Sequence, residues 1–140
     1  MKDSKPILLV EDDKVDVMQV KRALRDRNIS NPLLHPEDAA RAIEYLNEPG
    51  TPKPCMILLD LNMPGFDGFE FLKKMKSDRR LKKIPIIVLT TSDSDVDVKK
   101  CFDLGAAGYL VKPDDYEQFV NVVEIVNRYW TLNKMPNGIQ

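Results

Sequence analysis

Short apolar runs alternate with amphipathic segments along the whole of this 140-residue chain. The runs are rich in Ile, Leu and Val, whereas the segments between them repeat apolar side chains at helical spacing. This alternation is typical of a parallel sheet whose strands are joined by crossover helices, and it predicts a doubly wound α/β fold with five strands and five helices. The expected strands are Ile7–Val10, Leu33–His35, Met56–Leu59, Ile86–Thr90 and Gly108–Val111.

Each segment that follows a strand predicts one helix with an apolar stripe facing the core. The stripes consist of Val17, Val20 and Leu24; Ala39, Ala42, Ile43 and Leu46; Phe69, Leu72 and Met75; Val98, Cys101, Phe102 and Gly105; and Phe119, Val122, Val123, Val126 and Trp130.

Length and composition favour one domain over residues 1–140, with a core over about 6–132 and a short tail at 133–140. The formal charge of -1 argues against a nucleic-acid partner, because phosphate binding needs a basic surface. No apolar stretch approaches the length of a membrane span, so we expect a cytoplasmic protein with no membrane contact. Cys55 and Cys101 lack metal or redox spacing and are expected to be buried thiols.

Side chains that can take part in chemistry lie at the carboxyl ends of four of the predicted strands. Glu11 and Asp12 follow the first strand, Asp60 the third and Lys112 the fifth, while Thr90 ends the fourth. In a doubly wound sheet, ligands bind beyond the carboxyl ends of the strands, at the point where the connections switch faces. With strand order 2-1-3-4-5 that point lies between the first and third strands, so the carboxylates should face one another there.

Three neighbouring carboxylates repel one another and imply a cation. Oxygen ligands in a wet site favour Mg²⁺. The three negative charges of Glu11, Asp12 and Asp60 balance the three positive charges of Mg²⁺ and Lys112. Such a site suits phosphoryl transfer, in which Asp60 is the nucleophile and Thr90 donates its hydroxyl to a phosphoryl oxygen.

These residues resemble the receiver domains of two-component response regulators. The resemblance covers essentially the whole chain and implies a flavodoxin-like fold. Its motifs occur in order, with 30 positions from Asp60 to Thr90 and 22 from Thr90 to Lys112. The motifs are Val10-Glu11-Asp12-Asp13, Leu59-Asp60-Leu61-Asn62-Met63-Pro64-Gly65, Leu89-Thr90-Thr91-Ser92 and Gly108-Tyr109-Leu110-Val111-Lys112-Pro113.

The resemblance also implies roles for the acidic residues. Asp60 is the expected phosphoacceptor. Glu11 and Asp12 form the acidic pair, with Asp12 as a direct metal ligand, and the backbone carbonyl of Asn62 completes a metal set of Glu11, Asp12, Asp60 and Asn62.

Three further roles follow from the same resemblance. Thr90 is the switch hydroxyl, Tyr109 is the aromatic side chain whose inward rotation accompanies phosphorylation, and Lys112 contacts the phosphate. The peptide bond between Lys112 and Pro113 would be cis.

The implied function is that of a response regulator that takes a phosphoryl group from a histidine kinase and signals by a conformational switch or a phosphorelay. We expect no attached output domain and no catalysis beyond its own phosphorylation and dephosphorylation. The chain is more narrowly similar to regulators of phytochrome kinases in three segments: Leu89–Asp93, Asp78–Pro85 and Arg128–Trp130.

Two other functions use a similar strand-end site. Aspartyl-phosphate phosphatases need a second aspartate two positions after the nucleophile, where this chain has Asn62, so the general acid of that reaction is missing. A flavodoxin-like cofactor binder would carry a Ser/Thr/Gly-rich phosphate loop after its first strand, where this chain has acids.

Several of these polar residues have ordinary structural interpretations. Asp13 is expected to cap the first helix. Tyr109 could instead be an ordinary half-buried aromatic residue. His35 is interpreted as a polar strand end and not as a ligand.

The last helix carries a second apolar stripe of Ile125, Tyr129 and Leu132, more than one buried face requires. Scattered surface apolar residues are the simple explanation. The alternative hypothesis is a partner or homodimer surface that uses the fourth strand, the last helix and the aromatic pair Tyr129 and Trp130.

Overall fold

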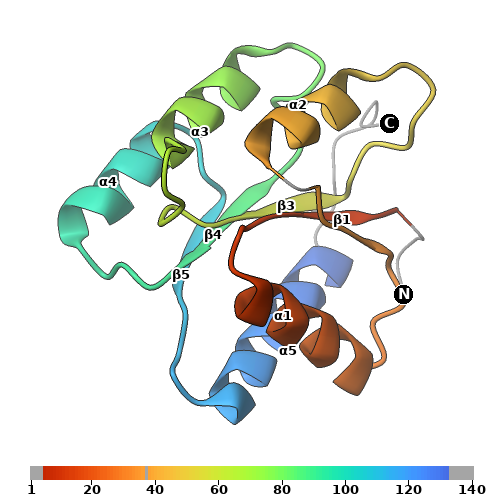
Figure 1. Ribbon diagram of the computed structural model, residues 1–140, viewed down its shortest axis with the longest axis vertical. Helices are drawn as coiled ribbons and strands as arrows, with labels where there is room; N and C mark the ends of the chain where they lie inside the picture. Colours follow the sequence, from red (N-terminus) through yellow and green to blue (C-terminus); the bar gives the residue numbers. More distant parts are fainter. Residues whose placement is uncertain (1–4, 37, 133–140) are drawn as a thin grey trace.

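A five-stranded parallel sheet lies between two layers of helices in the computed structural model, which describes residues 5–36 and 38–132 (Figure 1). The strand order β2-β1-β3-β4-β5 confirms the predicted doubly wound topology. The elements are β1 (Ile7–Val10), α1 (Lys14–Asp26), β2 (Leu33–Leu34), α2 (Ala39–Asn47), β3 (Met56–Leu59), α3 (Gly68–Ser77), β4 (Ile86–Thr90), α4 (Asp95–Asp103), β5 (Gly108–Val111) and α5 (Tyr116–Leu132).

Two hydrophobic cores lie on opposite faces of the sheet. Helices α1 and α5 cover one face, and α2, α3 and α4 cover the other (Figure 1). Successive strand residues point to opposite faces, so Leu8 and Ile57 belong to the core under α2 and α3, while Leu9 and Leu58 belong to the core under α1 and α5. Burial on both faces explains why β1, β3 and β4 are apolar throughout.

The strand register brings the polar strand ends together at one edge of the sheet. Val10 of β1 pairs with Leu59 of β3, and Thr90 of β4 pairs with Val111 of β5. Glu11, Asp60 and Lys112 follow β1, β3 and β5, and Thr90 ends β4. The proline-rich loop at 48–55 joins α2 to the start of β3 and therefore lies at the other end of the sheet.

Helix α1 begins where the sequence indicates. Asp13 is its N-cap, and one of its carboxylate oxygens accepts hydrogen bonds from the backbone N–H groups of Val15 and Asp16, at 2.8 and 3.1 Å. The cap satisfies two of the N–H groups that lack a partner within the helix. The predicted capping role of Asp13 is therefore confirmed.

The apolar stripe predicted for the fourth helix is wrong at two positions. Phe102 is half exposed, and Gly105 lies beyond the end of α4 with a φ of 100°. A glycine can take this left-handed conformation without steric cost, so Gly105 terminates the helix. Cys101 is buried as predicted, and both it and Cys55 are free buried thiols.

Two backbone expectations also need correction. Strand β2 ends at Leu34, one residue earlier than predicted, because it pairs with β1 through only two residues. No described peptide bond is cis, so the bond before Pro113 is trans. The trans form is the favoured one for most X–Pro bonds, and the cis expectation rested on family resemblance alone.

The second apolar stripe on α5 is exposed where it can be described. Ile125 and Tyr129 both present most of their side chains to solvent. The side chains of Trp130 and Leu132, and the predicted tail at 133–140, lie outside the described residues. None of the helices in the described part of the chain has the length and apolar character needed to span a bilayer.

Candidate functional site

Backbone hydrogen bonds place four of the predicted site residues in two neighbouring pairs. The N–H of Asp60 donates to the carbonyl of Val10 at 3.1 Å, which sets Asp60 beside Glu11. The N–H of Lys112 donates to the carbonyl of Thr90 at 2.7 Å. The parallel sheet thus gathers residues that lie about a hundred positions apart in the chain.

The ammonium group of Lys112 lies among three carboxylates. Its Nζ is 2.6 Å from Glu11 Oε1, 2.8 Å from Asp16 Oδ2 and 3.7 Å from Asp60 Oδ2. The Lys112 side chain is only 9% exposed, and Glu11 and Asp60 are buried as well. The site therefore carries its own compensating positive charge in a poorly hydrated environment.

Burial dominates the protonation of Glu11. Loss of hydration, with a smaller contribution from the nearby Asp60, raises the pKa of its carboxyl to about 7, even though Lys112 favours the ionised form. Burial would lower the pKa of Lys112, but its hydrogen bonds to Asp16 and Glu11 outweigh this and raise the pKa. Glu11 is thus poised to exchange a proton near neutral pH, while Lys112 stays charged.

The raised pKa of Glu11 predicts a pH-dependent stability in metal-free protein. The native state binds a proton more tightly than the unfolded state, where the pKa is near 4.5. The stabilising contribution is fully present below about pH 4.5 and is lost as pH rises through about 7, at a cost of the order of 1 to 3 kcal/mol. The free energy of unfolding, measured by chemical denaturation between pH 4 and 8 in the presence of a chelator, reports this contribution.

Glu11→Gln is the control for this prediction, because glutamine resembles the protonated glutamate. The free energy of unfolding of the wild type should fall relative to that of Glu11→Gln as pH rises. A difference between the two proteins that stays constant over this range would contradict the assignment.

Asn62 connects the phosphoacceptor to the switch hydroxyl. Its backbone N–H donates to Asp60 Oδ1 at 3.2 Å, and its side-chain Nδ2 donates to the hydroxyl oxygens of Thr90 and Thr91 at 3.0 and 2.8 Å. Thr90 is fully buried. The predicted nucleophile and the predicted switch hydroxyl are therefore bridged by one residue.

Tyr109 is half-buried and packs against the core under α2 and α3. Its hydroxyl donates to the backbone carbonyl of Ser92 at 2.7 Å, and the Ser92 hydroxyl donates to Asp97 at 2.7 Å. Burial raises the pKa of Tyr109, which keeps the phenol protonated and able to donate. Tyr109 thus links β5 to the start of α4.

The predicted metal ligands provide the oxygen donors that a hard cation prefers. Glu11 and Asp60 flank the same ammonium group, and Asp12 is exposed at the rim. In the described part of the chain, no three acidic, histidine or cysteine side chains converge closely enough to enclose a metal ion. Mg²⁺ needs only one or two protein carboxylates and keeps several waters, so this donor set fits it.

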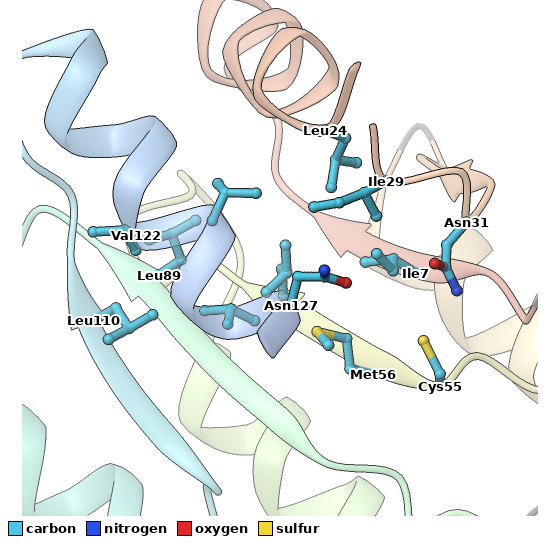
Figure 2. A pocket seen from close by; sticks show the side chains of 13 residues that line it. Ile7, Leu24, Ile29, Asn31, Cys55, Met56, Leu89, Leu110, Val122 and Asn127 are labelled. Carbon is cyan, nitrogen blue, oxygen red and sulfur yellow. The ribbon is translucent and has the colours of Figure 1, made fainter. Parts of the chain in front are cut away.

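An apolar cavity lies away from these residues. It has a volume of about 30 Å³ and is lined by side chains from β1, β3, β4, β5 and the middle of α5, among them Ile7, Met56 and Asn127 (Figure 2). Ligand sites usually measure several hundred Å³, and this volume suits about one water molecule. The strand-end cluster is therefore the better candidate for function.

Comparison with known proteins identifies the family. The sequence matches the family described as the response regulator receiver domain over residues 7–124. The chain belongs to this family. As a receiver domain it is a component of two-component signalling and not a classical enzyme.

Several relatives resemble this receiver domain over most of its length. It is 37% identical to the probable methanogenesis regulatory protein FilR2 of Methanothrix harundinacea over 134 residues, which cover 93% of this chain and 86% of that protein. It is also 37% identical to the response regulator Rcp1 of Synechocystis over 130 residues, which cover 90% of this chain and 88% of Rcp1.

Solved structures show the same similarity. The phosphorylated cyanobacterial phytochrome response regulator RcpA superimposes with a TM-score of 0.87 at 33% identity, covering 96% of this chain and all of RcpA (100%). A Mn(2+)-bound form of Rcp1 superimposes with a TM-score of 0.83 at 36% identity, covering 94% of this chain and 99% of that structure. This receiver domain is thus similar to phytochrome-associated regulators.

Two residues of the receiver site were not identified from the sequence. Asp16, in the first turn of α1, binds Lys112. His35 Nε2 hydrogen-bonds the backbone carbonyl of Glu11 at 2.7 Å, so its ring N–H holds the end of β1. The position of Asp16 in the first turn of α1, three residues after the N-cap Asp13, was the one available signal.

Proposed function

We propose that this receiver domain accepts a phosphoryl group on Asp60 from a sensor histidine kinase in a Mg²⁺-dependent reaction. The observation that supports this most strongly is the Lys112 ammonium, 2.6 Å from Glu11 and 3.7 Å from Asp60 in a buried site. It is a fixed positive charge beside the expected nucleophile, where the phosphoryl oxygens would arrive.

In the proposed reaction, a carboxylate oxygen of Asp60 attacks the phosphorus of a phosphohistidine. A P–O bond forms as the P–N bond breaks, and the electron pair of that bond returns to the imidazole, which takes up a proton. Lys112 neutralises charge on the phosphoryl oxygens, and the Thr90 hydroxyl turns from Asn62 to donate to one of them. The product is an aspartyl phosphate.

The residues that would hold Mg²⁺ are Glu11, Asp12, Asp60 and the backbone carbonyl of Asn62. A bound Mg²⁺ supplies positive charge for the phosphoryl oxygens. Oxygen ligands accept either Mg²⁺ or Mn²⁺, and the Mn(2+)-bound form of Rcp1 is consistent with a divalent cation here.

The similarity to RcpA and Rcp1 favours a phytochrome-type kinase as the phosphodonor. We further propose that residues 1–140 act as one receiver unit that passes its signal to a separate partner. Asn62 supports storage of the phosphoryl group, because the general acid of a multi-turnover phosphatase would stand at this position.

The test is to incubate the protein with a small phosphodonor and Mg²⁺ and to map the modified residue by mass spectrometry. A stoichiometric, hydroxylamine-sensitive adduct on Asp60 that a chelator prevents would support the proposal. An unmodified Asp60, or steady turnover of the phosphodonor without an adduct, would contradict the proposed function.

A homodimer through β5, α5 and the C-terminal aromatic residues is proposed as one way in which the signal could be passed on. The fourth strand, which the sequence also suggested for this surface, is buried along its whole length and cannot take part. The exposed apolar side chains of Val111, Ile125 and Tyr129 support the homodimer, because they lie on β5 and α5 and would be covered in a dimer. Light scattering in the presence of Mg²⁺ and a phosphoryl mimic measures the molar mass in solution. A monomer under these conditions would contradict the proposed homodimer.

A further inference from the structure

Asp16 holds the ammonium group of Lys112 together with Glu11. The distances from Lys112 Nζ to Asp16 Oδ2 and Glu11 Oε1, 2.8 and 2.6 Å, are those of hydrogen bonds. The 3.7 Å from the same nitrogen to Asp60 Oδ2 is too long for one. In this state Lys112 is therefore bonded to acids of β1 and α1, and not to the expected phosphoacceptor.

The two acids that bind Lys112 differ in exposure. The side chain of Glu11 is 2% exposed, whereas that of Asp16 is 31% exposed. Breaking the buried pair would leave an uncompensated charge in the interior, but water can solvate Asp16 when its bond is broken. Asp16 is thus the partner that Lys112 can release at lower cost.

The backbones on both sides of this bond are fixed. The N–H of Lys112 is bonded to the carbonyl of Thr90, and that of Asp16 to the capping carboxylate of Asp13. Any change in this bond must therefore come from the side chains of Lys112 and Asp16. The Lys112 ammonium has three N–H groups, and Glu11 and Asp16 already occupy two of them.

We propose that Asp16 is a positioning residue that holds Lys112 toward α1 in the unphosphorylated receiver and releases it when Asp60 carries a phosphoryl group. This inference rests on the proposed function. Asp16 holds the ammonium group toward α1, 3.7 Å from Asp60, whereas phosphoryl oxygens on Asp60 would draw it closer, so the two compete for its position. Neutralising Asp16 removes the competitor, so it favours the phosphorylated state.

The first measurement is the affinity for beryllofluoride, a phosphoryl analogue, in the presence of Mg²⁺. The dissociation constant should fall about 3- to 10-fold in Asp16→Asn, the effect of removing a partly exposed, charge-assisted hydrogen bond. Asp114→Asn is the matched control, because Asp114 is an exposed acid two positions from Lys112. Its dissociation constant should stay within about 2-fold of the wild-type value, since it makes no bond to the ammonium.

The second measurement is a double-mutant cycle on the unfolding of the protein without analogue. Asp16→Asn, Lys112→Gln and the double variant should give non-additive unfolding free energies, because the two side chains interact directly. This cycle does not depend on analogue binding, and it also reports whether each variant folds.

Each outcome is decisive. Additive unfolding free energies, or an analogue affinity of Asp16→Asn equal to that of Asp114→Asn, would overturn the inference about Asp16 alone. A wild-type protein that binds no analogue and gains no phosphoryl group would overturn the proposed function, even if the cycle remained non-additive.

Discussion

The variant Asp60→Asn will take up phosphoryl groups from a small phosphodonor at least about 10³-fold more slowly than the wild type, the scale of loss seen when a nucleophile is removed. An amide is a far weaker nucleophile than a carboxylate, and no acyl phosphate can form on it. The measurement is the mass of the intact protein over time in the presence of Mg²⁺.

Asp67→Asn is the control for this loss. Asp67 is exposed and caps α3 by accepting the N–H groups of Phe69 and Glu70, a role that asparagine also fills. Its phosphorylation should match that of the wild type. Equal labelling of Asp60→Asn and the wild type would mean that another side chain is the acceptor.

The largest loss of stability is expected for Ile57→Ala. Ile57 lies in the middle strand β3 and is 0% exposed, in the core under α2 and α3. Truncating it removes apolar contacts and leaves a cavity, which should lower the free energy of unfolding by about 3 to 4 kcal/mol. Urea denaturation measures the change.

Ile125→Ala is the matched control, since it makes the same truncation on the exposed face of α5, where the side chain is 64% exposed. Its effect should stay within about 0.5 kcal/mol of zero for the monomer. A loss at Ile125 as large as that at Ile57 would show that the second apolar stripe is covered in solution.

The fold was predictable because local and long-range signals agree in this chain. The bounds of β1, β3, β4 and β5 match the structure. The first three of these strands are apolar runs that are buried on both faces, and such runs have few other places to go. The meeting of Glu11, Asp60, Thr90 and Lys112 was also predictable, because parallel strands end at one edge of a sheet.

Other features depend on three-dimensional facts that the sequence does not carry. Whether Asp16 faces solvent or Lys112 depends on how α1 is rotated over the sheet. The contact of His35 with Glu11 depends on where the short strand β2 ends. An acid in a first helical turn and a histidine after a strand are both common, so neither pattern singles out a site.

The error at the end of α4 has a simple cause. Gly105 continues an apolar spacing, but it also carries the helix-ending signal of a glycine after a charged turn. The helix ends before this glycine even though the apolar spacing continues through it. An apolar stripe at helical spacing that reaches a glycine after a charged turn therefore predicts a helix that ends before that glycine.

The hydrogen bonds that join the ends of β4 and β5 form a closed ring. Lys112 is bonded through its backbone to Thr90, and Tyr109 is bonded through its hydroxyl to Ser92. The four residues belong to two short segments, 90–92 and 109–112, which are tied at both ends. Neither segment can slide without pulling the other, so the ring ties the position of the Tyr109 side chain to that of the end of β4.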